Sequence, residues 1–148
     1  VRFERTTYNV LPFKFEAGTS NYTGAIALGS ALEYVRSTGL ENIITHEKKL
    51  LSYATKKMME LGDITIYGNA QNKISIISFL PDNIHALDMG MLLDKMGVAV
   101  RTGTHCTQPV MDHFGISGTI RASMVFYNTI EEIDIFIEAA KKAKSMLS

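Results

Sequence analysis

The segment TIRASMVFYNTIEEIDIFIEAA, residues Thr119 to Ala140, decides the fold class because it changes hydrophobic period partway along. Up to Phe126 the residues alternate between two faces, as in a half-buried β-strand. The first face carries Ile120, Ala122, Met124 and Phe126, and the second carries Thr119, Arg121, Ser123 and Val125. Thr129 and Glu132 then have the spacing of a capping box, which marks the start of a helix. The apolar stripe of that helix is Ile133, Phe136, Ile137, Ala140 and Leu147.

Working outward from this strand and helix, similar patterns predict the remaining elements. Thr23 is the expected N-cap of a helix that Gly39 ends. Further helices are expected over residues 40–61, 83–95 and 110–114, and strands over 64–67, 73–80 and 97–101. The strand 73–80 is apolar on both faces, so we expect it to be central. The sequence predicts an α+β fold: a small, mostly antiparallel sheet covered by helices on one side.

Chain length and patterning predict one main domain. A chain of 148 residues buries roughly 70% of its unfolded surface, which suffices for one core. Residues 1–22 mix aromatic and polar groups and are predicted to be an extended lead-in and connecting segment. Residues 23–148 are predicted to form the compact domain.

Charge and composition limit the classes of function. Fifteen basic residues balance fifteen acidic ones, so nothing favours a nucleic-acid or anionic membrane surface. No apolar run approaches the ~20 residues of a membrane span, and no signal-peptide pattern is present. A cytoplasmic, reducing location is therefore expected, with no nucleic-acid or membrane partner.

The single cysteine, Cys106, lies in RTGTHCTQPVM, residues Arg101 to Met111, where the periodic pattern stops. Polar and cationic groups surround it, as expected of a reactive loop thiol, although a partly exposed structural thiol fits the same pattern. One cysteine excludes an intrachain disulfide and a multi-cysteine metal site. In an extended segment the side chain of His105 points away from Cys106. A histidine partner for the thiol therefore has to come through the fold, from His46, His85 or His113.

Two further positions are candidates for chemistry. Arg121 lies on the face opposite Ile120 and Ala122, where its guanidinium either holds a carboxylate through two parallel hydrogen bonds or lies in solvent. The stretch 18–21, Gly-Thr-Ser-Asn, precedes a helix and is suited either to binding a phosphate or to a simple cap and turn. The irregularly spaced histidines do not form a metal-ligand pattern, and no metal site is predicted.

Four segments, taken in order, resemble one known family. They are LPFKFEAGTSN (residues 11–21), GAIALGSALEYV (24–35), LLDKMGVAVRTGTHCTQPVM (92–111) and IRASMVFYNTIEEID (120–134). The family is that of SufS-type (group II) cysteine desulfurases and selenocysteine lyases, which are class V aminotransferases that use pyridoxal 5'-phosphate. The short loop around the cysteine is similar to group II. The resemblance implies that the chain is the C-terminal small domain of a fold-type I pyridoxal-phosphate enzyme.

The resemblance also implies roles for individual residues. Cys106 takes the sulfur of L-cysteine as a persulfide and releases L-alanine, while Arg121 holds the substrate carboxylate. Arg101 and His105 support the loop. Thr19 reaches the cofactor phosphate in the partner subunit of a homodimer. The Schiff-base lysine belongs to a large domain that no segment here resembles, so the isolated chain is expected to be inactive.

The implied partners are L-cysteine and a sulfur-acceptor protein of the SufE or SufU type that serves iron–sulfur cluster assembly. Two departures occur in the loop: Thr104 stands where many members have a second histidine, and Thr107 where they usually have alanine. Three alternative functions stay open: a selenocysteine lyase, a stand-alone persulfide carrier, and an interaction domain with an inert cysteine.

Overall fold

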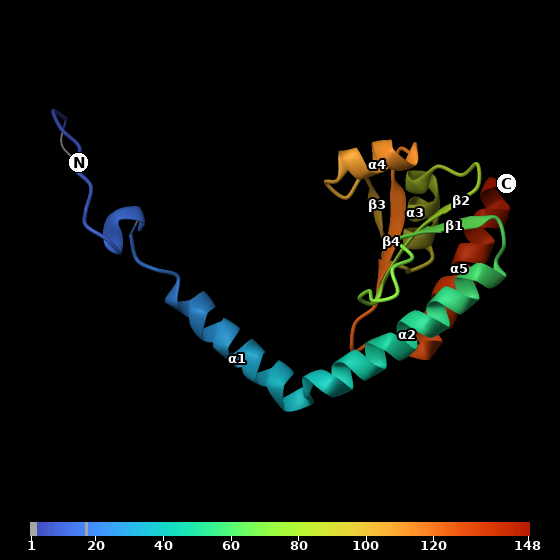
Figure 1. Ribbon diagram of the computed structural model, residues 1–148, viewed down its shortest axis with the longest axis horizontal. Coiled ribbons are helices and arrows are strands. Elements are labelled where there is room, and N and C mark those ends of the chain that lie inside the picture. Colours follow the sequence, from blue (N-terminus) through green and yellow to red (C-terminus); the bar gives the residue numbers. More distant parts are fainter. Residues whose placement is uncertain (1–2, 17) are drawn as a thin grey trace. The chain divides into compact units, whose positions relative to one another are not determined.

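The computed structural model describes residues 3–16 and 18–148 (Figure 1). Residues 1, 2 and 17, which belong to the predicted lead-in, lie outside this description. Backbone contacts divide the chain into two compact units, Val1–Leu40 and Glu41–Ser148. The predicted domain division at residues 22 and 23 falls within the first unit and stays a prediction.

The first unit contains a short 3₁₀ helix, η1 (Phe13–Phe15), and the helix α1 (Tyr22–Thr38). The prediction that Thr23 is the N-cap of this helix is wrong. Asn21 caps α1 because its side-chain oxygen accepts the Gly24 N–H at 2.9 Å, the bond that defines an N-cap. Gly39 follows the helix with a φ of 88°, a conformation that glycine adopts without steric cost.

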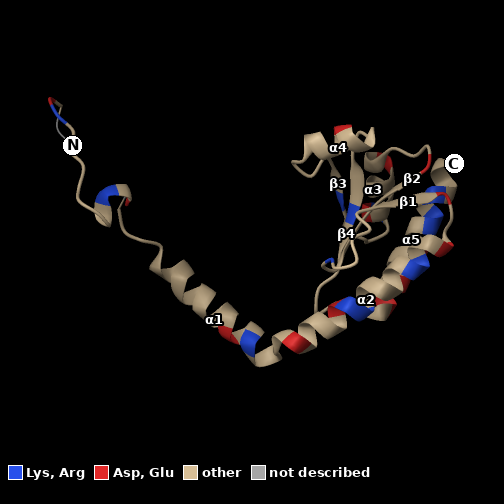
Figure 2. Cartoon of the chain, in the orientation of Figure 1, with Lys and Arg blue, Asp and Glu red and all other residues tan. Residues whose placement is uncertain are grey.

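Helix α1 has no buried residue, although most of its residues are apolar. Its charged residues lie toward its C-terminal end (Figure 2). Large apolar side chains are exposed along its length: Tyr22, Ile26, Leu28, Leu32 and Tyr34. An apolar helix without a core in its own unit is suited to packing against another protein surface.

The second unit is built around a four-stranded sheet. In chain order its elements are α2 (Leu40–Glu60, which begins at the unit boundary), β1 (Ile64–Tyr67), β2 (Ile76–Pro81), α3 (Ala86–Lys95), β3 (Arg101–Gly103), α4 (Gln108–Phe114), β4 (Thr119–Ser123) and α5 (Ile130–Leu147). The strand order is β1-β2-β4-β3. All three strand pairs are antiparallel. The predicted α+β fold is confirmed, as is the central place of the second strand.

One face of the sheet forms the core. Ile77 and Phe79 of β2 are buried beside Ile120 and Ala122 of β4, which confirms the predicted alternation as far as Ser123. The strand ends there and does not reach Phe126 as predicted. Helices supply the opposing side chains: Leu50, Ala54 and Met58 from α2, Met89 and Leu93 from α3, and Ile133, Phe136, Ile137 and Ala140 from α5. The capping box of α5 is also present, with both hydrogen bonds formed between Thr129 and Glu132.

The third strand differs from the prediction. It covers Arg101–Gly103 instead of residues 97–101. The preceding segment stays with α3, because the Val98 N–H donates to the Leu93 carbonyl at 2.9 Å. Pairing with β4 starts only where Arg101 lies opposite Arg121. Arg101 is therefore a strand residue with a fixed position beside β4.

The prediction that helices cover only one side of the sheet is wrong. Tyr67 and Ser78 lie on the face opposite the core, and the ring of Tyr67 contacts Phe114 of α4 with 5.2 Å between centroids. Val110 and Met111 of α4 line a pocket together with these two sheet residues. Helix α4 thus lies over the second face, where it follows the Cys106 loop directly in the chain (Figure 1).

Candidate active site

A row of four side chains crosses the sheet on the face opposite the core. Strand register places Tyr67 opposite Ser78, Ser78 opposite Arg121, and Arg121 opposite Arg101. Residues directly opposite in neighbouring strands project to the same face. The row therefore brings the predicted Arg121 beside the predicted Arg101, with a hydroxyl-bearing residue on its other side.

The Cys106 thiol lies at the Arg101 end of this row. Cys106 is exposed, and a guanidinium nitrogen of Arg101, Nη2, lies 3.8 Å from its sulfur. His105 and Cys106 have φ angles of 55° and 62°, which is uncommon for residues other than glycine. The thiol is thus presented to solvent from a tight loop, next to a cation.

His105 points back to the sheet. Its Nε2 lies 3.2 Å from the Thr119 carbonyl oxygen and 3.0 Å from the Thr119 hydroxyl. Since a carbonyl only accepts, Nε2 carries the proton. Burial lowers the pKa of His105, and Arg121 and Arg101 lower it further against the opposing effect of the Thr119 hydrogen bond. His105 is therefore neutral at pH 7, and it fixes the loop to β4.

The other three histidines contact groups away from the thiol. His46 contacts the Asn128 carbonyl at 2.9 Å, His85 caps α3, and His113 packs against Phe114. His105 and Cys106 do not lie in an extended segment, because both have positive φ angles in a tight loop. Their side chains contact different groups: His105 contacts Thr119 and Cys106 contacts Arg101.

Arg121 is partly buried beneath the loop and α4. Its Nε atom is fully buried and has no hydrogen-bond partner. Within residues 3–16 and 18–148, neither Arg101 nor Arg121 forms an ion pair with a carboxylate. Figure 2 shows the basic segments of β3 and β4 side by side. Two guanidinium groups that form no ion pair with a carboxylate among the described residues make this end of the sheet suited to binding an anion.

A pocket of about 290 Å³ adjoins Arg121. Polar groups from β1, β2 and β4 line one wall, and α4 supplies the apolar wall. Besides Arg121, its lining includes Tyr67, Ser78, His105, Thr119 and Phe114. The pocket lies directly behind the Cys106 loop.

Thr19, the predicted phosphate-binding residue, belongs to the first unit. It is exposed in a bend between Gly18, with a φ of 138°, and the capping residue Asn21. The Asn21 cap on Gly24 shows that the predicted cap and turn exist. An exposed hydroxyl ahead of a helix N-terminus fits contact with a phosphate, so that role stays a prediction.

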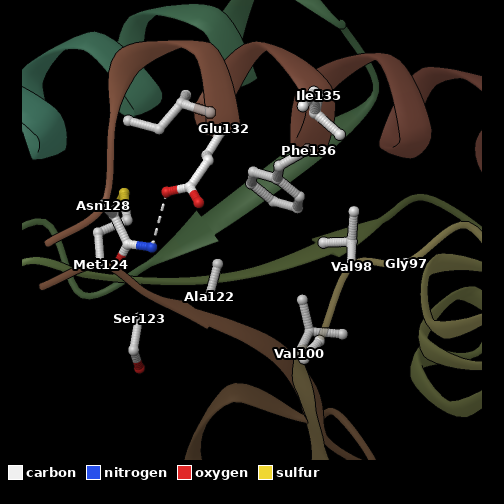
Figure 3. Close-up of a pocket in the computed structure, with 12 residues that line it drawn as sticks. Gly97, Val98, Val100, Ala122, Ser123, Met124, Asn128, Glu132, Ile135 and Phe136 are labelled. Carbon is white, nitrogen blue, oxygen red and sulfur yellow. Dashed lines mark hydrogen bonds between the residues drawn. The ribbon is translucent and has the colours of Figure 1, made fainter.

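A second cavity, of about 370 Å³, lies where α5 crosses the end of β4 (Figure 3). Its walls are mainly apolar and include Val98, Val100 and Phe136. The carboxylate of Glu132 at its edge is already engaged, because it accepts from Asn128 Nδ2 and the Thr129 N–H, each at 3.0 Å. None of the predicted site residues lines this cavity.

The described part of the chain contains neither a metal-ligand cluster nor a membrane-spanning helix. No group of three or more His, Cys, Asp or Glu side chains is arranged to hold a metal ion among residues 3–16 and 18–148. Over the same residues, the helices include none with the length and apolarity needed to span a bilayer.

The chain belongs to the aminotransferase class-V family, whose profile matches residues 1–136. It is 44% identical over 147 residues to a probable cysteine desulfurase of Xylella fastidiosa, covering 99% of this chain and 35% of that protein. It is 42% identical over 144 residues to a cysteine desulfurase of Escherichia coli, covering 97% of this chain and again 35% of the relative. The chain thus spans about a third of the length of these relatives.

Solved structures agree with the sequence relatives. A cysteine desulfurase from Thermococcus onnurineus superimposes with a TM-score of 0.85 at 35% identity, covering 99% of this chain and 37% of that one. The cysteine desulfurase CsdA of Escherichia coli gives a TM-score of 0.86 at 31% identity, covering 100% and 37%. These likenesses confirm the resemblance to cysteine desulfurases of the class V aminotransferases and the fold that it implied.

Sequence reasoning named the charged members of the site and missed their neighbours. Tyr67, Ser78 and Thr119 were not predicted as site residues. Their hydroxyl-bearing side chains look like ordinary strand residues, and only strand register places Tyr67 and Ser78 in line with Arg121. Thr119 had one available signal, because it lies two residues before Arg121 on the same predicted face.

Proposed function

We propose that this chain is part of a pyridoxal-phosphate-dependent cysteine desulfurase, in which Cys106 is the nucleophile and Arg121 the carboxylate clamp. The observation that carries the proposal is the exposed thiol of Cys106, whose sulfur lies 3.8 Å from Arg101 Nη2. Arg101 is in turn the residue of β3 that lies directly opposite Arg121 of β4. A sulfur nucleophile and an anion clamp on one sheet face are what the removal of sulfur from an amino acid requires.

The proposed reaction balances without an external oxidant or reductant. The Cys106 sulfur attacks the sulfur of L-cysteine, so that an S–S bond forms and the C–S bond of the substrate breaks. The electron pair of that bond stays with the carbon fragment, which takes up a proton and leaves as L-alanine. Cys106 is left as a persulfide. Bound pyridoxal phosphate supplies the electron sink for this bond cleavage.

The residues of this chain bind and orient the substrate. Arg121 can hold the α-carboxylate through two parallel hydrogen bonds, which leaves the substrate sulfur free to meet Cys106. Arg101 places a positive charge beside the sulfur anion that forms. His105 keeps the loop on β4. Thr19 is exposed, and its hydroxyl can donate a hydrogen bond to a phosphate. We propose that it contacts the cofactor phosphate bound in the partner subunit of a homodimer.

The Schiff-base lysine is proposed to lie outside residues 1–148. Two lysines in polar surroundings already have local contacts: Lys14 Nζ lies 5.6 Å from the ring centre of Phe15, and Lys73 Nζ donates to the Gly68 carbonyl at 3.2 Å. We therefore propose that the 148-residue chain alone does not release sulfide from cysteine. A physiological role in iron–sulfur cluster assembly, with a SufE- or SufU-type acceptor in the cytoplasm, completes the proposal.

The test compares Cys106→Ala and Cys106→Ser with the unaltered protein, each in the full-length polypeptide that contains this chain. Both variants should bind the cofactor normally, as judged by its visible absorbance, and lose persulfide and sulfide formation from L-cysteine. Full-rate release of alanine and sulfide by Cys106→Ala would remove Cys106 from the reaction. Parallel assays with selenocysteine distinguish a desulfurase from a selenocysteine lyase by the ratio of kcat/KM values.

Two alternatives make different predictions for the same variants. A persulfide carrier accepts sulfur on Cys106 from a donor persulfide but forms no alanine. An interaction domain with an inert cysteine resists alkylation by iodoacetamide at neutral pH. Alanine release that depends on Cys106 excludes both.

A further inference from the structure

The loop that carries Cys106 contains a strained turn. The Thr107 N–H donates to the Thr104 carbonyl at 2.9 Å, which closes a four-residue turn. Its two central residues, His105 and Cys106, both have positive φ angles, as in a type I′ turn. Side chains with a Cβ disfavour this conformation because the Cβ crowds the following carbonyl oxygen. The turn therefore needs support from its surroundings.

The Thr107 side chain gives the turn a second closing bond. Its hydroxyl donates to the same Thr104 carbonyl at 2.8 Å. Thr107 is also the N-cap of α4, a position where a threonine hydroxyl ordinarily accepts an N–H of the first helical turn. Here it makes no such bond. The Val110 N–H bonds to the Thr107 backbone carbonyl at 2.9 Å instead. The Thr107 hydroxyl thus bonds within the turn and does not cap the helix.

Contacts with the sheet also hold the turn. One of its two central residues, His105, contacts Thr119 of β4. Just before the turn, Gly103 runs so close to Gly118 that a Cβ on Gly118 would lie 2.9 Å from Gly103 backbone atoms. The two bonds from Thr107 join the ends of the turn, and Cys106 lies exposed at its centre.

We propose that Thr107 is a positioning residue for the nucleophile: its hydroxyl closes the turn and holds Cys106 in the left-handed conformation that presents the thiol. The proposal rests on the proposed role of Cys106 and adds to it a residue that acts through the geometry of the turn. Removing the hydroxyl lets the turn relax to more favourable φ angles. Cys106 then spends less time in the attacking geometry, while Arg121 still binds substrate.

The test uses full-length protein with Thr107→Val, which keeps the shape and removes the hydroxyl, and Thr107→Ser, which keeps the hydroxyl. The loss of one hydrogen bond predicts that Thr107→Val lowers kcat for L-cysteine about fivefold. KM should change less than about twofold, because the carboxylate clamp is untouched. Thr107→Ser should rescue kcat. Thr65→Val, at an exposed threonine on β1, controls for the general effect of the substitution.

Several outcomes overturn the proposal. Equal kcat values for the Val and Ser variants refute it, and so does a loss that disappears when rates are divided by the folded fraction. If Thr107→Val does not fold, Thr107→Ala is compared with Thr107→Ser under the same expectation. Full desulfuration by Cys106→Ala overturns the proposed function and this inference together. A normal dependence on Cys106, with equal Val and Ser rates, overturns this inference alone.

Discussion

The Gly118→Ala substitution tests the close contact between β3 and β4 at the base of the Cys106 loop. A Cβ built on Gly118 lies 2.9 Å from both the carbonyl carbon and the oxygen of Gly103, and 3.1 Å from its Cα. Gly118 is not among the glycines with a positive φ, so its backbone conformation is open to alanine. The substitution is disfavoured by the close contact of the added Cβ with Gly103.

The geometry sets the size of the effect. Ordinary van der Waals contact for a Cβ begins near 3.4 Å, so the strands must separate by about 0.5 Å. The obstructing atoms belong to backbone that is paired in register, Gly103 opposite Thr119, and cannot turn aside as a side chain can. Overpacking of this kind costs about 1–3 kcal/mol. Because Thr119 also holds His105, the shift reaches the nucleophile loop.

Native-state hydrogen exchange of the full-length protein measures this cost locally. A loss of about 1–3 kcal/mol accelerates exchange of the β3 and β4 amides roughly 5- to 150-fold, with a fall in kcat. Gly29→Ala is the matched control. Nothing lies within 4 Å of its added Cβ in α1, and alanine should stabilise that helix by about 0.5–1 kcal/mol. Unchanged exchange in β3 and β4, together with unchanged kcat, would refute the steric argument.

Three further predictions concern single side chains. Arg121→Lys removes the planar fork and should raise KM for L-cysteine about 10-fold or more in steady-state assays; an unchanged KM would exclude Arg121 from carboxylate binding. Thr129→Ala removes the capping-box acceptor at the start of α5 and should cost about 1 kcal/mol in urea unfolding, against no change for the exposed Thr65→Val. Burial lowers the pKa of His105 below its usual 6.5. The unfolded chain therefore binds a proton at His105 more readily than the folded chain does, and the free energy of unfolding should fall as the pH drops below 6.5. His105→Gln should flatten that pH dependence of unfolding, and an identical slope in both proteins would show that His105 does not contribute to it.

Local patterns were sufficient for most of the elements. The alternation after Thr119 and the capping box at Thr129 correctly predicted a strand followed by a helix, because both signals arise within a few residues. The third strand was misplaced because Val98 to Val100 have strand-like composition but remain tied to α3 through the Val98 N–H. The cap of α1 was also misplaced, since Asn21 and Thr23 are both good caps and only backbone geometry selects between them.

The chemical groups of the site could be chosen from the sequence, but their arrangement could not. A lone thiol in a polar loop and an arginine on a strand made Cys106 and Arg121 candidates, and the resemblance to cysteine desulfurases gave them their predicted roles. Strand register alone places Arg101 opposite Arg121 and extends the row to Tyr67. The positive φ angles of His105 and Cys106, and the use of the Thr107 hydroxyl to close their turn, depend on where β4 holds the loop.

The sequence by itself determined which residues alternate, which helix is capped and which side chains carry reactive or charged groups, because these are local properties of the chain. Tertiary structure decided which of those groups meet. Distances between strands that lie far apart in the sequence are set by pairing and packing, and these brought a thiol, two guanidinium groups and a neutral histidine to one end of a sheet.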